Sequence, residues 1–491
     1  MRRKFGLKRC TALLTAGCMA AAVLCGCSDG AVDYSLDTEG SSEESSGGLA
    51  QFAELSQWTD EWEITGADGK AVTFQVDAKI TVPDTDAMSV AEVEETVIDG
   101  AFKEHLARAF FGEETVYYHD REHLSKEELQ EQVEDLENRI QVKRDDIEGY
   151  QGLIEINKDF PEEVERYQEY IQEAQDDIQE YEAGVADYQN LMSTAPEQYM
   201  PADDFGECDE YVAYRNGQKY LFCVYTPESS SKSNQLDMRT YEETVKITLE
   251  PEDSIESWKP EELEGKSDWI LYTSADVEGD VNQCETTKEE ARELAERFVE
   301  QAGFSHRMCN YAEDIVWCGF DQNANGSRKN EEYVTKGYVF TFVAGIDGRI
   351  PLSGFSNYYY DGYQMSDEDY GMQDMISIIV NDDGIARVII DNPVTVTSAA
   401  GNVGLLSFQT VQGIMQAEIQ EHPDRYDLEN LKPSNIMELN YLRVKDGSRD
   451  KVYSYIPAWE LSYQGNTSET RYHPVYVNAI DGSVIYPWKE K

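Results

Sequence analysis

The apolar positions of the chain follow two different periods. Between residues 124 and 193 they recur at alternating intervals of four and three residues, which is the heptad spacing of helices that pack in a coiled coil. After Pro196, short runs alternate apolar and polar residues, as half-buried strands do. The sequence therefore predicts an α+β protein in which helices and antiparallel strands occur in one chain.

The heptad segment contains two seams joined by a short link. The first seam has one polar position, Lys143, and the second follows Pro161, which suits the first turn of a helix. Because the link is short, the two helices must run antiparallel, and we predict an inserted coiled-coil hairpin over 124–193. Two interpretations remain open: the apolar stripe serves only the hairpin's own seam, or the acidic outer faces or the tip also meet a partner. The seam positions are Leu129, Val133, Leu136, Ile140, Lys143, Ile147, Tyr150 and Ile154, then Val164, Tyr167, Ile171, Ala174, Ile178, Tyr181, Val185, Tyr188 and Met192.

Residues 55–280 are predicted to form an N-terminal α+β domain around this hairpin. An alternating strand comes first, and Ser89 with Glu92 has the spacing of a capping box that opens a helix. Further strands follow the hairpin, with Asn216-Gly217 as a type I′ turn between two of them.

The C-terminal half repeats one order of elements. Thr287 and Ser407 each predict the start of a helix, and each helix is followed by alternating strands that end in an Asp-Gly turn. This order predicts two tandem helix-on-antiparallel-sheet units, over 285–398 and 404–491.

The N-terminal segment has the pattern of an export signal that ends in a lipidated cysteine. Basic residues precede an apolar run too short to span a bilayer as a helix, and Leu24-Cys25-Gly26-Cys27 is typical of a bacterial lipobox. We predict a signal peptide at 1–26, a lipid anchor on Cys27, and a disordered Ser/Gly/Asp/Glu-rich tether at 27–54. The protein is then expected on the extracytoplasmic side of the cell membrane, held by its N-terminal lipid.

The charge of the chain narrows the class of partner. With 97 acidic and 41 basic residues, the formal net charge is -56, so nucleic acid and anionic lipid surfaces would repel the protein. Cations and cationic peptides are favoured instead.

Five cysteines follow Cys27, and an odd number in an exported chain leaves at least one thiol unpaired. Cys208 with Cys223 and Cys309 with Cys318 remain open as disulfides, with buried free thiols as the alternative.

One loop has the spacing of a calcium-binding loop. Residues 321–332 fit D-x-[DN]-x-[DN]-G-x5-E, which places oxygen-bearing side chains and a turn-forming glycine where a hard cation needs them. The flanks are typical of strands rather than helices, and Arg328 occupies a position that is usually apolar, so a polar hairpin turn is the alternative interpretation. The candidate ligands for Ca²⁺ as a cofactor are Asp321, Asn323, Asn325, Ser327 and Glu332.

Two other groups of residues are candidates for binding. Residues His119 to His123 have the pattern H-x-x-E-H, which binds zinc only when both histidines share a helix face. Because Ser125 and Glu128 predict the start of a helix just after this motif, we predict that the histidines lie in a solvated loop.

Clustered tyrosines in the loop 352–373 either stack on sugars and peptides or fold back over a sheet. These candidate contacts are Tyr358, Tyr359, Tyr360 and Tyr363. We predict no catalytic residues and a protein that is not an enzyme.

The C-terminal half resembles a class of extracytoplasmic regulatory domains. Tyr455-Ile456-Pro457-Ala458-Trp459 followed by 477–485 looks like the ending of PepSY-type and YycH/YycI-like domains, and 338–342 with 346–351 looks like their strand-and-turn motif. The mature chain also resembles uncharacterised lipoproteins of Gram-positive gut clostridia. The resemblance covers 290–487 and implies a fold and a protein-binding or regulatory role without catalytic residues. Regulators of that class are held by a transmembrane helix rather than by a lipid.

These observations lead to three expected functions from different classes. The first is a non-catalytic lipoprotein that binds an extracytoplasmic protein or peptide through its sheet domains and helical hairpin. The alternative is a lipoprotein that binds a solute, a glycan or calcium, through the tyrosine loop and the loop at Asp321. An extracytoplasmic hydrolase acting through an acidic pair is the third.

Overall fold

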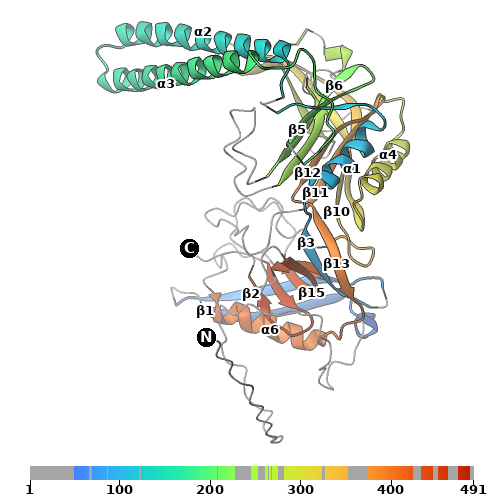
Figure 1. Ribbon diagram of the computed structural model, residues 1–491. Helices are drawn as coiled ribbons and strands as arrows, with labels where there is room; N and C mark the ends of the chain where they lie inside the picture. The colour runs from blue at the N-terminus through green and yellow to red at the C-terminus, as the bar shows by residue number, and fades with distance from the viewer. Residues whose placement is uncertain are drawn as a thin grey trace, which may run out of the picture.

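The computed structural model consists of two large sheets and a helical hairpin that projects from one of them (Figure 1). This arrangement confirms the predicted α+β class. The structure describes residues 49–486 apart from 66–68, 86, 121–122, 207, 227–244, 253–259, 264, 267, 275–280, 323–326, 352–373, 424–432, 446–451 and 463–473.

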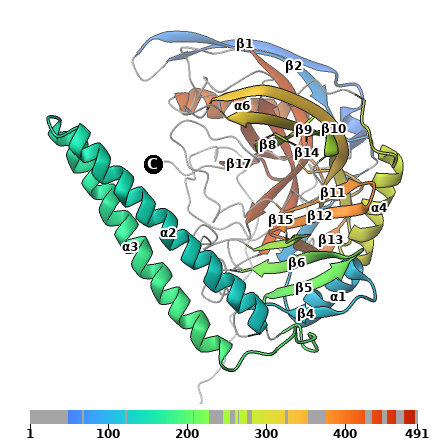
Figure 2. The same ribbon diagram turned by 90° about the horizontal axis from the view of Figure 1, so that it is seen from above.

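The first sheet has nine strands, all antiparallel, in the order β4-β5-β6-β7-β12-β11-β10-β9-β8. Two helices, α1 and α4, lie side by side on one face of it (Figures 1 and 2). The rings of Phe110 and Phe298 join these helices, with centroids 6.1 Å apart, and one hydrophobic core runs beneath both. The elements are α1 (Gly100–Phe111), β4 (Val116–Tyr118), β5 (Glu210–Arg215), β6 (Gln218–Tyr225), β7 (Lys246–Pro251), β8 (Asp268–Thr273), α4 (Lys288–Gln301), β9 (Arg307–Gln322), β10 (Arg328–Ala344), β11 (Met375–Asn381) and β12 (Gly384–Asp391).

Among the described residues, the unit of a helix followed by four successive antiparallel strands occurs three times. Two copies, α1 with β4 to β7 and α4 with β9 to β12, supply eight strands of the nine-stranded sheet and meet where β7 pairs with β12. The ninth strand, β8, pairs with β9 at the edge. The third copy lies in the second sheet and contains α6 (Phe408–Glu421), β14 (Ser434–Lys445), β15 (Val452–Ser462), β16 (Val475–Asn478) and β17 (Val484–Ile485). The sequence repeat identifies two of the three units, because the hairpin is inserted between the first and second strands of the other.

The second sheet has eight strands and combines both ends of the chain. β2 pairs in parallel with β14, and β3 pairs with both β13 and β15. Alternate residues of β2, among them Phe74 and Val76, pack in the same core as Val411 and Met415 of α6. The remaining strands of this sheet are β1 (Gln57–Thr65), β2 (Ala71–Thr81), β3 (Val90–Glu95) and β13 (Val394–Ala400).

The domain boundaries therefore differ from the predicted ones. Residues 49–95 and 394–485 build the eight-stranded sheet, whereas 100–391 build the nine-stranded sheet and the hairpin. The predicted N-terminal domain at 55–280 is divided between the two sheets. The predicted unit at 285–398 completes the nine-stranded sheet rather than forming a sheet of its own. Alternating apolar and polar residues along a strand indicate which face is buried but do not identify the neighbouring strand. The assignment of each strand to its sheet could therefore not be predicted from the local sequence.

Two predictions near the N-terminus are also wrong. The predicted tether at 27–54 extends too far, because Leu49–Phe52 forms a 3-10 turn (η1) whose Phe52 is buried against Trp459. The helix predicted at Ser89 is the strand β3, since pairing with β13 and β15 outweighs a local capping signal. The helix α1 begins later, where Asp99 accepts a hydrogen bond from the backbone N–H of Phe102 at 2.9 Å.

A buried ion pair lies where the two sheets meet. Arg307 of β9 pairs with Asp374 just before β11, and both side chains are 2% exposed. The guanidinium also donates to the carbonyl of Val394 at the start of β13 (2.9 Å), while Asp374 accepts from the backbone N–H groups of Ala344 (2.9 Å) and Val394 (3.2 Å). Both charged groups thus make further hydrogen bonds at the point where the chain passes from one sheet to the other, although Nε of Arg307 is buried without a hydrogen-bond partner among the described residues.

Replacing Asp374 by alanine should lower the free energy of unfolding by about 3–5 kcal/mol, because the Arg307 guanidinium would stay buried without its counter-charge. Urea unfolding at neutral pH measures this loss. As a control, Glu296→Ala removes an exposed partner of Arg292, where less than about 1 kcal/mol is expected. Equal losses for the two variants would contradict a structural role for the buried pair.

Candidate functional site

The feature that distinguishes this molecule is the long helical hairpin, which we call the arm. It consists of α2 (Lys126–Ile156) and α3 (Pro161–Met192), which pack antiparallel and extend away from both sheets (Figures 1 and 2). At about 1.5 Å per residue the arm is roughly 45 Å long. The predicted inserted hairpin is confirmed, including its capping box at Ser125 and Glu128 and the proline in the first turn of α3.

Contacts along the seam hold the two helices together. Near the base the predicted seam positions of α2 are buried, from Leu129 to Ile140. Close approach is possible at Gly184, where a Cβ atom would lie only 2.9 Å from Cδ1 of Leu136. The one polar seam position, Lys143, forms an ion pair with Asp177 of α3 at 2.7 Å, and this hydrogen bond raises the pKa of the lysine. The polar break in the heptads is therefore used for a cross-helix contact.

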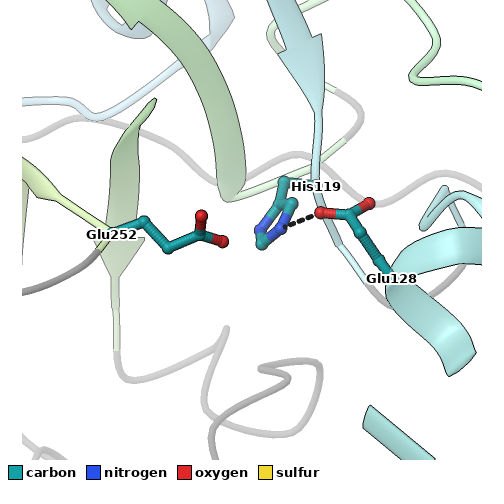
Figure 3. Close-up of side chains that lie close together, drawn as sticks. All are labelled: His119, Glu128 and Glu252. Atoms are coloured by element: carbon teal, nitrogen blue, oxygen red, sulfur yellow. Dashed lines mark hydrogen bonds and ion pairs between the residues drawn. The ribbon is translucent and has the colours of Figure 1, made fainter. Parts of the chain in front are cut away.

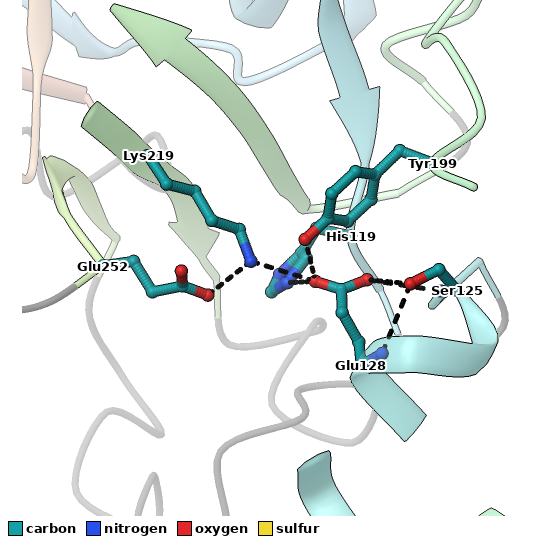
Figure 4. Close-up of polar contacts among 6 residues, drawn as sticks. All are labelled: His119, Ser125, Glu128, Tyr199, Lys219 and Glu252. Atoms are coloured by element: carbon teal, nitrogen blue, oxygen red, sulfur yellow. Dashed lines mark hydrogen bonds and ion pairs between the residues drawn. The ribbon is translucent and has the colours of Figure 1, made fainter. Parts of the chain in front are cut away.

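The base of the arm is held by one buried carboxylate, that of Glu128 (Figure 4). Its Oε2 accepts from the backbone N–H and hydroxyl of Ser125, at 3.2 and 3.3 Å, which is the capping box. Its Oε1 accepts from Nε2 of His119 (2.8 Å), from the hydroxyl of Tyr199 and from Nζ of Lys219 (3.1 Å). We call Glu128 and these partners the base cluster. It ties the first turn of α2 to β6 and to the segments that flank β4 and β5.

The base cluster holds Glu128 in its ionised form. Burial alone would raise the pKa of this carboxyl, but the hydrogen bonds and charges of His119, Tyr199 and Lys219 lower it to about 2. Burial would lower the pKa of Lys219, yet Glu252 and Glu128 raise it overall. The pKa of Tyr199 is raised by burial and by the neighbouring carboxylate. The cluster is thus a stable arrangement of opposite charges rather than a pair poised to exchange a proton.

Three of these residues have the composition of a metal site. The ligand atoms of His119, Glu128 and Glu252 lie within 4.8 Å of one another (Figure 3). However, Nζ of Lys219 donates to Glu252 at 2.5 Å as well as to Glu128, so an ammonium group already bridges the two carboxylates (Figure 4). A metal ion would have to displace this cation, and the geometry favours a structural ion network.

The H-x-x-E-H segment lies at the edge of this cluster. As predicted, both histidines precede the first turn of α2 and do not share a helix face. The predicted solvated loop is wrong for His119, whose side chain is 16% exposed and paired with Glu128. His123 stacks on Tyr118 with ring centroids 4.7 Å apart. The capping box could have identified Glu128 as a buried carboxylate, but nothing near it in sequence points to Tyr199, Lys219 or Glu252.

The calcium-like segment begins at the end of β9 and ends within β10, and these two strands pair antiparallel. Asp321 accepts from the side-chain amide of Asn330 at 2.8 Å, and Glu332 pairs with Lys266 at 3.1 Å. Ser327 is exposed. Asn323 and Asn325 lie outside the described residues, so calcium binding stays a prediction.

Other predicted positions lie outside the described part of the chain, namely Cys27 and Tyr358, Tyr359, Tyr360 and Tyr363. The five cysteines beyond residue 200 are all described and form no disulfide. Within the described segments, none of the helices combines the length and the apolar character that crossing a membrane requires.

Comparison with known proteins gives no family for this chain. No family model matches it, and no curated protein does. Among solved structures, it is similar to an uncharacterized protein from Eubacterium rectale ATCC 33656, with 12% sequence identity and a TM-score of 0.33 over 89% of this chain and 97% of that one. A similarity this low assigns neither fold nor function.

The Glu128→Gln variant should lose stability at neutral pH and little of it in acid. The folded pKa of Glu128 is about 2, against 4.5 for the ordinary carboxyl, so its contribution is complete above pH 4.5 and is lost as the pH falls towards 2. The shift corresponds to a contribution on the order of 3 kcal/mol. Urea unfolding of both proteins at pH values from 7 down to 3 measures the difference.

The matched control is Glu197→Gln, which removes an exposed carboxylate that pairs with Lys126 at the same end of the arm. It should change the free energy of unfolding by less than about 1 kcal/mol at every pH. A difference between Glu128→Gln and the parent that stays constant from pH 7 to pH 3 would show that the charge of Glu128 is not what stabilises the base.

Proposed function

We propose that this protein is a lipid-anchored, extracytoplasmic and non-catalytic lipoprotein that binds another protein through its arm. The observation that carries the proposal is that the arm extends about 45 Å from the body while its base is fixed by a buried ion network. A rigid projection reaches a partner without first losing the freedom of a flexible segment, which lowers the entropic cost of binding.

The packing of the arm supports this role. In α2 the buried positions all lie between Glu128 and Ile140, close to the body, and in α3 they are Ala174 and Tyr188. The outer half of the arm therefore adds nothing to the cores of the two sheets. Ordering residues costs about 1–2 kcal/mol each, and a segment so long that does not stabilise the body is best explained by what it contacts outside it.

The chemistry of the base cluster supports a non-catalytic protein. A general base works best with a pKa near the working pH, whereas Glu128 has a pKa of about 2 and four hydrogen-bond partners. The resemblance of the C-terminal half to PepSY-type regulatory domains also fits a binding role. The alternative, a lipoprotein that binds a glycan or calcium, would give the arm no part in function.

Shortening the arm should abolish binding and leave the body folded. Replacing 144–176 by a short glycine-rich turn keeps Lys143 and Asp177, which pair across the seam, at the new end. Pull-down from the cell envelope should recover the partner with the parent protein and lose it with the shortened one. An unchanged urea midpoint serves as the control for folding. Retention of the partner by the shortened protein would contradict binding through the arm.

Replacing Cys27 by alanine should release the protein from the membrane fraction into the medium, because Cys27 is the proposed attachment site of the acyl chains. Cell fractionation measures the location, and mass spectrometry of the parent should find acyl chains on this sulfur. Cys25→Ala is the matched control and should remain with the membrane. A Cys27→Ala protein that still sediments with the membrane would contradict the lipid anchor.

A further inference from the structure

Three large apolar side chains are exposed together at the end of the arm. Leu153 is 37% exposed, Ile156 is 76% exposed, and Phe160 is 62% exposed. The first two belong to the last turn of α2, and Phe160 immediately precedes α3. We call these three residues the apolar tip.

The coiled-coil seam does not account for the apolar tip. The nearest seam positions are Ile154 on α2 and Val164 on α3, and both are half-buried, whereas the tip residues lie off the seam and are exposed. Polar residues at these positions would leave the packing of the arm unchanged and would avoid exposing apolar surface to water.

The residue at the start of α3 strengthens this argument. Phe160 occupies the N-cap, where Ser, Thr, Asp or Asn is preferred because its side chain accepts from a free backbone N–H. Phe160 makes no such hydrogen bond. An apolar ring thus replaces a stabilising cap and remains exposed, so local helix formation does not explain its presence.

The charges around the apolar tip restrict what can cover it. α3 carries ten acidic residues and one basic residue, and that residue, Arg166, is paired with Glu163. Beside the tip itself, Glu155, Asp159 and Glu162 outnumber one exposed basic residue, Lys158. An anionic lipid surface or the acidic arm of a second copy would be repelled, whereas a protein surface carrying lysine and arginine would be attracted.

We propose that Leu153, Ile156 and Phe160 are the contact residues of the arm and that they insert into an apolar groove rimmed by lysine or arginine on a partner protein. This inference rests on the proposed function, because it specifies which part of the arm binds. A few apolar side chains seated in a groove provide most of the binding energy, and the acidic rim provides orientation and selectivity.

The probe for this test is a synthetic amphipathic helix with a leucine face flanked by lysines, titrated by fluorescence anisotropy against the full-length protein. The Ile156→Ser/Phe160→Ser variant should bind it at least tenfold more weakly than the parent. The matched control is Val142→Ser, which removes a side chain that is 57% exposed on α2 at a distance from the tip and should bind as the parent does. Raising the salt concentration should weaken binding by the parent, since the charges of the rim are exposed.

Several outcomes would overturn the inference. The first is that the parent and the double variant bind the lysine-flanked helix equally well. The second is that the parent binds an analogue flanked by glutamates as well as it binds the lysine-flanked helix. The third is tip-dependent binding to vesicles of phosphatidylcholine. A tip-dependent dimer in sedimentation would do so as well. If the double variant keeps the envelope partner that the shortened arm loses, this inference fails and the proposed function stands; if the shortened arm keeps the partner, the proposed function itself fails.

Discussion

The position of the arm depends on a single buried negative charge. Removing a carboxylate from water is costly unless other groups replace its hydration, and Glu128 receives those groups from His119, Ser125, Tyr199 and Lys219. These partners belong to segments before α2, after α3 and on β6, so the carboxylate can be satisfied only when the arm leaves the sheet in one direction. The energetic need to neutralise this charge therefore helps to fix the direction in which the arm leaves the nine-stranded sheet.

The same principle operates at the junction of the two sheets. Arg307 and Asp374 are buried at the crossing between them, and Tyr441 of the eight-stranded sheet donates to Asp347 beyond the end of β10 at 2.5 Å. The backbone N–H of Ser89 in turn donates to the Tyr441 hydroxyl at 2.9 Å. Charged and polar contacts of this kind require defined geometry, whereas apolar surfaces can slide over one another. These contacts therefore hold the two sheets in one relative orientation, so the arm also keeps one orientation relative to the eight-stranded sheet.

How much of this could be predicted from the sequence depended on the distance between the interacting residues. The arm was predictable because its heptads and the capping box of Ser125 and Glu128 are local patterns. The parallel pairing of β2 with β14 was not, because alternation does not name a partner. Ser89 and Glu92 carried a true capping spacing that strand pairing overrode. Likewise, Lys219 and Glu252 are distant from Glu128 in sequence, and only the fold brings them to the base cluster. The exposure of the apolar tip could not be predicted either, because it depends on which residues near the end of the arm are buried in the seam.

The arrangement of the two sheets bears on how the proposed anchor and arm would work together. The described chain begins with Leu49–Phe52, packed on the eight-stranded sheet, whereas the arm leaves the nine-stranded sheet at the other end of the body (Figure 1). A tether from a lipid on Cys27 would join the body at the eight-stranded sheet. Because the junction between the sheets is held by a buried ion pair, the arm would then be kept on the side of the body away from the attachment point. An acidic arm held in that position is suited to a partner outside the membrane surface rather than to the lipids beneath it.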